Sequence, residues 1–216
     1  MNKPFVVIPA FNEGSTIEEV VNSAKKYVQN IIVVDDASLD NTYELSVKCG
    51  ATVLRSPVNQ GYDSSLEFGF SHAIKQGATS ILTIDADGQH PFYVIPQMIN
   101  LVENENYEFV IGIRPNLPRF SEELFSFFTK IRFSINDITC GMKCYKANIF
   151  KKYGFKKKYN SIGTYLALNA LKNNHRSTEI LINVKPRLDN SRYGVNLISE
   201  LNIICALIKS VPYFLW

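Results

Sequence analysis

The first half of the chain alternates between short, continuously apolar segments and longer segments whose apolar residues recur at helical spacing. The apolar runs predict five strands, at residues 5–9, 31–34, 52–54, 81–84 and 109–113. The segments between them predict helices, as at residues 92–105, where Ile95 and Val102 share one face. Strands that are apolar throughout and separated by such helices are typical of a parallel sheet covered on both faces. We therefore expect an α/β fold.

Local signals mark the ends of the first two helices. Ser15 and Glu18 have the spacing of a capping box, which predicts that the first helix begins there. Asp40 is placed to cap the second helix. We expect that helix to end at Gly50, because glycine suits the left-handed conformation that closes many helices.

The second half of the chain is less regular. Its patterns predict a helix, a loop with a short strand, a helix, a strand and a helix, at residues 115–136, 137–145, 162–171, 180–184 and 195–208. No internal repeat or low-complexity linker interrupts the sequence. We therefore expect a single domain over residues 1–216.

Two carboxylates follow the fourth predicted strand directly. In an extended backbone, residues two apart point to the same side, so Asp85 and Asp87 can converge on one point. Two neighbouring carboxylates at the edge of a core repel each other unless a cation lies between them. Mg²⁺ and Mn²⁺ prefer oxygen ligands of this kind and hold phosphate groups. The pair therefore predicts a divalent metal site.

More polar residues follow the ends of other predicted strands. Ligands of open parallel sheets bind beyond the carboxyl ends of the strands, so these residues should meet at one rim. The residues in question are Pro9, Phe11, Glu13, Asp35, Asp36, Asp85, Asp87 and Arg114.

The composition excludes some classes of function. A net charge of +3, with no dense basic stripe, argues against nucleic-acid binding. The four cysteines lack the paired spacing of a zinc site and are expected to be reduced, partly buried thiols, at Cys49, Cys140, Cys144 and Cys205. We expect no signal peptide, because a strand begins within a few residues of Met1, and no segment is apolar enough to span a bilayer.

The densest basic run lies between Lys151 and Lys158. We interpret it as a solvated surface loop, and contact with an anionic membrane is the functional alternative.

Four motifs occur in the order found in family 2 glycosyltransferases: Val7-Ile-Pro-Ala-Phe-Asn-Glu13, Val34-Asp-Asp-Ala-Ser-Leu-Asp-Asn-Thr42, Asp85-Ala-Asp-Gly-Gln-His-Pro91 and Asp137-Ile-Thr-Cys-Gly-Met-Lys143. Over residues 4–195 the chain resembles this family, and within it the dolichyl-phosphate mannosyltransferases and bacterial polyprenyl-phosphate sugar transferases. The resemblance implies a GT-A fold, which is a Rossmann-like, mostly parallel sheet with helices on both faces, plus a C-terminal helical acceptor-side segment. It also implies a GDP- or UDP-hexose donor, Mg²⁺ or Mn²⁺, and inversion at the anomeric carbon.

The resemblance divides the domain into a nucleotide-sugar-binding half at residues 1–114, an acceptor-side half at 115–196 and an apolar C-terminal helix at 197–216. It assigns the nucleoside and its ribose to Pro9, Phe11, Glu13, Asp35 and Asp36, and the metal with the diphosphate to Asp85, Asp87 and Gln89. It assigns a substrate phosphate to Arg114, and closure over the donor diphosphate to Arg192. Asp137 either anchors its loop or orients the acceptor.

The acceptor is predicted from what the sequence lacks. A sugar hydroxyl needs a general base, whereas a polyprenyl phosphate is already anionic and needs only cations. The one acidic pair downstream of the metal motif, Glu122 and Glu123, lies in a predicted helix outside the context of a base, which favours a lipid-phosphate acceptor.

Several alternatives stay open. The apolar tail either packs on the sheet or lies in a membrane interface, which would place the enzyme peripherally at the cytoplasmic face of the cell membrane. A nucleotidyltransferase would need a basic, glycine-rich loop after the first strand, which is missing at residues 10–14. A catalytically silent scaffold with the same fold is the third alternative.

Overall fold

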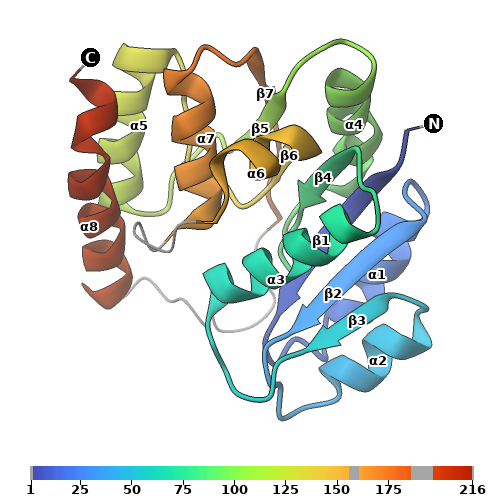
Figure 1. Cartoon of the computed structure of the whole chain (residues 1–216). Coiled ribbons are helices and arrows are strands. Elements are labelled where there is room, and N and C mark those ends of the chain that lie inside the picture. The colour runs from blue at the N-terminus through green and yellow to red at the C-terminus, as the bar shows by residue number, and fades with distance from the viewer. Residues whose placement is uncertain (1, 156–160, 186–196, 216) are drawn as a thin grey trace.

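A computed structural model describes residues 2–155, 161–185 and 197–215, and these form a seven-stranded sheet with helices on both faces (Figure 1). The strands are β1 (Pro4–Ala10), β2 (Asn30–Asp35), β3 (Thr52–Arg55), β4 (Ser80–Thr83), β5 (Phe109–Ile113), β6 (Lys143–Lys146) and β7 (Ser177–Leu181). The helices are α1 (Ile17–Lys25), α2 (Thr42–Lys48), α3 (Tyr62–Lys75), α4 (Ile95–Glu103), α5 (Phe120–Phe133), α6 (Ala147–Tyr153), α7 (Ile162–Lys172) and α8 (Leu197–Phe214), with a 3-10 turn, η1 (Phe92–Val94), before α4. The expected α/β fold is confirmed.

The strand order reverses between β1 and β4. The sheet runs β3-β2-β1-β4-β6-β5-β7, in which β1 pairs in parallel with β2 and with β4. Only β6 is antiparallel to its neighbours, β4 and β5. Open α/β sheets bind ligands beyond the strand C-termini at such a reversal. The topology therefore points to the loops that follow β1 and β4.

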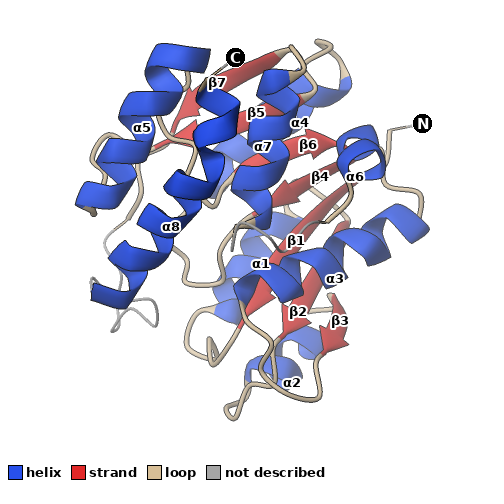
Figure 2. Cartoon of the chain, turned by 60° about the vertical axis from the view of Figure 1, so that its left-hand side comes forward, coloured by secondary structure: helices blue, strands red, loops and turns tan. Residues whose placement is uncertain are grey.

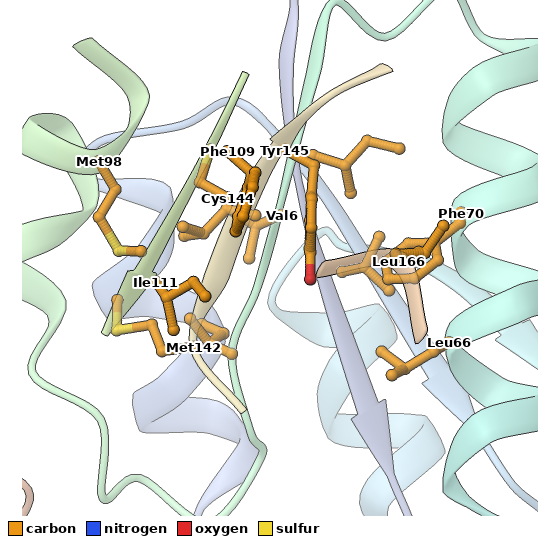
Figure 3. Close-up of a cluster of buried hydrophobic side chains, with 14 of the residues drawn as sticks. Val6, Leu66, Phe70, Met98, Phe109, Ile111, Met142, Cys144, Tyr145 and Leu166 are labelled. Carbon is orange, nitrogen blue, oxygen red and sulfur yellow. The ribbon is translucent and has the colours of Figure 1, made fainter. Parts of the chain in front are cut away.

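The sheet is buried between two layers of helices (Figure 2). α3 packs against β1 and β2, while α4 packs against β4, β5 and β6. Figure 3 shows Phe70 of α3 and Met98 of α4 entering the core from opposite sides, with Val6 and Tyr145 of the sheet between them. All four of these side chains are fully buried. This two-sided burial explains why β1, β2, β4 and β5 are almost continuously apolar.

A third group of helices, α5, α7 and α8, packs beside the sheet (Figures 1 and 2). The N–H of Ser121 in α5 donates to Glu200 Oε2 in α8 at 3.0 Å, and the rings of Phe133 and Phe214 lie 6.1 Å apart at the other ends. The two helices therefore run in parallel, side by side. α8 packs on helices α5 and α7, and within the described residues no helix is long and apolar enough to cross a membrane.

Some local predictions were wrong. The predicted capping box is not formed, because Thr16 is the N-cap of α1 and its hydroxyl donates to the carbonyl of Ala86 at 2.7 Å instead of capping the helix. Lys151 and Lys152 lie in α6, a short helix that the sequence analysis missed. β7 begins earlier than predicted, because its half-exposed residues carry no continuous apolar signal.

The second helix follows its signals more closely. Asp40 accepts a hydrogen bond from the N–H of Thr42, the first residue of α2, at 3.0 Å. Gly50 follows the end of α2 with φ of +72°, which is the left-handed conformation expected there.

Candidate active site

Hydrogen bonds join the loops that follow β1, β2 and β4. The N–H of Asn12 donates to Ser38 Oγ at 2.9 Å, and the Asn12 side chain accepts from the N–H of Leu39 at 2.7 Å. The N–H of Glu13 donates to Thr42 Oγ1 at 2.8 Å, and Thr16 reaches the loop after β4. The predicted rim at the strand C-termini is therefore formed. The Glu13 side chain is buried there.

Asp35 is the last residue of β2 and Asp36 follows it directly, and both are buried. Asp36 accepts the N–H groups of Gln60 and Gly61 at 2.9 and 2.7 Å, and so holds the chain at the start of α3. Asp35 Oδ1 accepts from the N–H of Ser38 at 3.1 Å. Its other oxygen lies 3.1 Å from Arg55 Nε as an ion pair, without the alignment of a hydrogen bond. Both carboxylates thus organise loops around the rim, and a role in nucleoside binding stays a prediction.

Asp85 is held from two sides. The hydroxyl of Tyr62 donates to Oδ1 at 2.9 Å, and Nε2 of His90 lies 3.6 Å from Oδ2. Nδ1 of His90 accepts the N–H of Asp85 at 3.1 Å, so the proton of a neutral His90 ring is on Nε2, which is the nitrogen near the carboxylate. Burial, followed by the charge of Asp85, raises the pKa of Tyr62 well above its ordinary value. Tyr62 therefore stays a protonated donor.

On its third side, the Asp85 carboxylate faces the backbone of Gly141. A Cβ at Gly141 would lie 2.5 Å from Asp85 Oδ2, so only glycine allows this approach. Thr83 of β4 donates through its hydroxyl to the carbonyl of Gly141 at 2.6 Å, which ties the loop between α5 and β6 to the same strand that presents Asp85.

The rest of the predicted metal motif forms a tight turn. Gly88 has φ of +73°, and the N–H of Gln89 donates to Asp87 Oδ1 at 3.1 Å. The side-chain amide of Gln89 donates to the carbonyl of Lys185 at 2.8 Å, and the N–H of Lys185 returns a bond of 2.9 Å to the Gln89 carbonyl. Gln89 therefore connects the turn to the segment after β7.

The donor set fits a metal that is shared with a substrate. Among the described residues, no group of three or more His, Cys, Asp or Glu side chains could hold an ion alone. Asp85 and Asp87 supply hard carboxylate oxygens, and the Asp85 side chain is 33% exposed. Two carboxylates suit Mg²⁺ or Mn²⁺ when phosphate oxygens and water complete the shell.

Arg114 and Asp137, which the sequence analysis treated separately, form one ion pair. Arg114 Nε and Nη2 donate to the two oxygens of Asp137 at 2.7 and 2.9 Å, and Nη2 also donates to Thr139 at 3.0 Å. Burial alone would lower the pKa of Arg114, but the hydrogen bonds and charge of Asp137 outweigh it and raise the pKa above its ordinary value. Glu122 bridges Arg114, at 3.4 Å, and Arg119, at 2.8 Å.

Gly141 also lines a small cavity with both polar and apolar walls. The cavity has a volume of about 40 Å³ and is lined by residues that include Tyr62, Thr139, Lys143 and Ser161. Lys143 is buried, donates to the carbonyl of Cys140, and has a pKa that burial lowers. Sequence reasoning missed Tyr62 entirely and quoted Gly141 and Lys143 only as parts of a motif. Gly141 and Lys143 could have been singled out from the sequence, because a glycine and a lysine occur together there in a buried, polar loop.

Three remaining predicted residues differ in where they lie. Pro9 is buried near the end of β1, beyond the last residue that pairs with β4, where a missing N–H is tolerated. Phe11 is half-buried directly after β1. Arg192 lies outside the described residues.

The chain matches the family described as Glycosyl transferase family 2 over residues 5–171. It is 31% identical to the UDP-N-acetylglucosamine–dolichyl-phosphate N-acetylglucosaminyltransferase of Methanococcus voltae, over 53% of each protein. It is 35% identical to the dolichol-phosphate mannosyltransferase of Pyrococcus furiosus, over 52% of this chain and 33% of that protein. The matches thus span about half or less of the length of these two curated relatives.

The structure is also similar to a solved one. Glucosyl-3-phosphoglycerate synthase of Mycobacterium tuberculosis, crystallised with Mn²⁺, uridine diphosphate and phosphoglyceric acid, superposes with a TM-score of 0.76. The superposition covers 97% of this chain and 78% of that one at 17% identity, and it shows a shared fold.

Proposed function

Because the chain belongs to glycosyl transferase family 2, we propose that it moves a hexose, with inversion, from a nucleotide diphosphate sugar to a polyprenyl phosphate or a lipid-linked glycan. The donor would be a UDP- or GDP-hexose, and the reaction would serve cell-surface glycoconjugate synthesis at the cytoplasmic face of a membrane. The observation that carries the proposal is the convergence of Asp85, Tyr62 and Gly141 at the reversal of strand order.

The metal is part of the proposal. Mg²⁺ or Mn²⁺ bound by Asp85 and Asp87 would neutralise negative charge on the departing nucleoside diphosphate. Tyr62 and Gly141 hold the Asp85 carboxylate in one orientation, and Gln89 holds the turn that carries Asp87. The Mn²⁺ and uridine diphosphate in the similar synthase structure support this reading.

The proposed acceptor follows from the ion pairs that the acidic side chains near Arg114 form. Asp137 is fully engaged by Arg114, and Glu122 is buried between Arg114 and Arg119, so neither is placed as a general base. A phosphate acceptor needs no base. The hydrogen bonds of Arg114 to described residues use Nε and Nη2, which leaves the two N–H groups of Nη1 for a phosphate oxygen. Two relatives named for dolichyl-phosphate acceptors support the same choice.

The alternatives differ in their support. Family membership speaks against a nucleotidyltransferase. A catalytically silent scaffold would be recognised because it binds no nucleotide sugar. The test is thermal unfolding with UDP- and GDP-hexoses in the presence of Mn²⁺, because a ligand that binds the native state raises the melting temperature.

We expect one nucleotide series to stabilise the wild-type protein only when Mn²⁺ is present, and Asp87→Ala to remove the effect. If no nucleotide sugar stabilises the protein with Mn²⁺ present, the scaffold reading replaces the proposed function.

A further inference from the structure

Two adjacent helices present apolar side chains to solvent. On α5 these are Phe120, Phe127, Phe128 and Ile131, which are 70%, 57%, 40% and 70% exposed. On α8 they are Leu201, Ile208 and Val211, which are 53%, 63% and 42% exposed, with Leu215 directly after the helix at 62%. We call these eight residues the α5–α8 surface.

The exposed residues form stripes. At 100° per residue, Phe120, Phe127 and Ile131 fall within a narrow sector of α5. Leu201 and Ile208, seven positions apart, do the same along α8. Because α5 and α8 run in parallel and pack side by side, the stripes run along neighbouring helices (Figures 1 and 2). Exposed apolar stripes of this kind on neighbouring helices indicate an interaction site.

Toward the C-terminal ends of the two helices, the charged residues beside the stripes are all positive, whereas the exposed Glu123 lies near the start of α5. Lys130, Arg132 and Lys209 are exposed. The sequence has no Asp or Glu from residue 124 to 136 or from 201 to 215. Lys130 and Arg132 flank Ile131 in the helix, which puts one cation on each side of the apolar stripe. Cations that flank apolar and aromatic residues match an anionic lipid surface, where the apolar groups enter the boundary and the cations meet headgroups.

The surface is coupled to the candidate site through α5. At the start of the helix, Glu122 links Arg119 to Arg114. In its second turn, the hydroxyl of Ser126 donates to the carbonyl of Asn136 at 2.5 Å, next to Asp137. The helix that carries the exposed phenylalanines therefore also braces the Arg114–Asp137 pair.

We propose that the α5–α8 surface docks the protein onto an anionic lipid bilayer. This inference rests on the proposed lipid-phosphate acceptor, because it would present the headgroup of a membrane-held phosphate lipid to the side of the fold that carries Arg114. The occupant is the bilayer itself, bound peripherally by apolar insertion and by the three cations.

The test is sedimentation with vesicles, in the absence of metal and nucleotide sugar. One vesicle is phosphatidylcholine, and the other is an equal mixture of phosphatidylcholine and phosphatidylglycerol. We expect the wild-type protein to bind the mixed vesicles more tightly. Replacing Lys130, Arg132 and Lys209 by Gln should weaken binding to the mixed vesicles by about fivefold for each charge removed, with little effect on binding to neutral vesicles.

The apolar contribution is tested with Phe127→Ser/Ile131→Ser, which should lose binding to both vesicles. Val47→Ser/Val58→Ser is the matched control, because these side chains are 48% and 62% exposed elsewhere on the protein. Circular dichroism checks folding, and Ile208→Ser/Leu215→Ser is the second variant if the first does not fold.

Three results would overturn the proposal. The wild-type protein fails to sediment with the mixed vesicles, or Phe127→Ser/Ile131→Ser binds as tightly as the control. The third is a wild-type dimer that the same substitution separates, since the surface would then belong to a second copy of the chain. Transfer measured in detergent tests the proposed function without a bilayer, so the two proposals can fail independently.

Discussion

At the scale of single residues, the candidate site depends on how closely Gly141 approaches Asp85. The glycine backbone forms one wall of the carboxylate, and Tyr62 and His90 form two others. His90 belongs to the same motif as Asp85, but Tyr62 and Gly141 come from segments far along the chain, so the spacing of the Asp85 and Asp87 pair did not reveal their contacts. The sequence singled out the two carboxylates as a predicted metal site, and only the fold could show what orients Asp85.

Replacing Gly141 by Ala tests this contact. The new Cβ would lie 2.5 Å from Asp85 Oδ2, so either the carboxylate or the loop must move. We expect a loss of about 1 to 3 kcal/mol in the free energy of unfolding, as for other overpacked sites. We also expect that added Mn²⁺ strengthens nucleotide-sugar binding less than it does in the wild-type protein. Urea denaturation and thermal shift measure the two effects.

Gly163→Ala is the matched control. Its Cβ would lie 3.7 Å from Lys143 Nζ, an ordinary contact distance, and the residue is in α7, where alanine is the better helix former. We expect no loss of stability or binding. Equal behaviour of the two variants would contradict the role assigned to Gly141.

At the scale of elements, the Arg114–Asp137 pair connects β5 to the loop before β6, and Glu122 extends the connection to α5. Arg114 and Asp137 had separate predicted roles, and they lie together because two hydrogen bonds join the guanidinium to the carboxylate. A bidentate pair of this kind fixes the loop before β6 relative to the end of β5.

Asp137→Asn should therefore be strongly destabilising. The substitution removes the negative charge that the Arg114 guanidinium meets through two hydrogen bonds, and the loss of one charge from a buried pair costs about 3 to 5 kcal/mol. Glu18→Gln, which removes the exposed pair with Lys48, should cost less than about 1 kcal/mol. Urea denaturation of both variants decides the matter. A similar small cost for both would mean that the pair does not brace the site.

Elements with strong patterns were predictable and those with weak ones were not. The strands β1, β2, β4 and β5 and the helices α3, α4 and α7 follow from nearly continuous burial or from one apolar face. α6 was missed because it is short, and β7 was misplaced because its residues are half-exposed. The antiparallel insertion of β6 between β4 and β5 depends on pairing across the chain, which local periodicity does not encode.

At the scale of the whole molecule, the buried cysteines should make the free energy of unfolding vary with pH in the alkaline range. Cys49, Cys140 and Cys144 are buried free thiols and Cys205 is exposed, which matches the expectation of reduced, partly buried cysteines. Burial, aided by the charge of Asp137, raises the pKa of Cys140 from 9.0 to about 12. Burial raises the pKa of Cys144 as well.

Between pH 9.0 and about 12 the unfolded chain therefore loses protons that folded Cys140 retains. Stability should fall as the pH rises through this range, by about 1.4 kcal/mol per pH unit for each such thiol. Cys140→Ala should make the fall less steep, and Cys205→Ser should leave it unchanged. Urea denaturation over this pH range measures the slopes, and identical slopes in all three proteins would contradict the prediction.

Our central proposal is that metal-dependent hexose transfer takes place at the rim where the strand order reverses. The most direct measurement follows radiolabelled hexose from UDP- or GDP-hexose into a short-chain polyprenyl phosphate in detergent, with Mn²⁺ or with EDTA. The account predicts labelled lipid with Mn²⁺, and none with EDTA or with folded Asp87→Ala. Labelled lipid formed equally well with EDTA and by Asp87→Ala would contradict it.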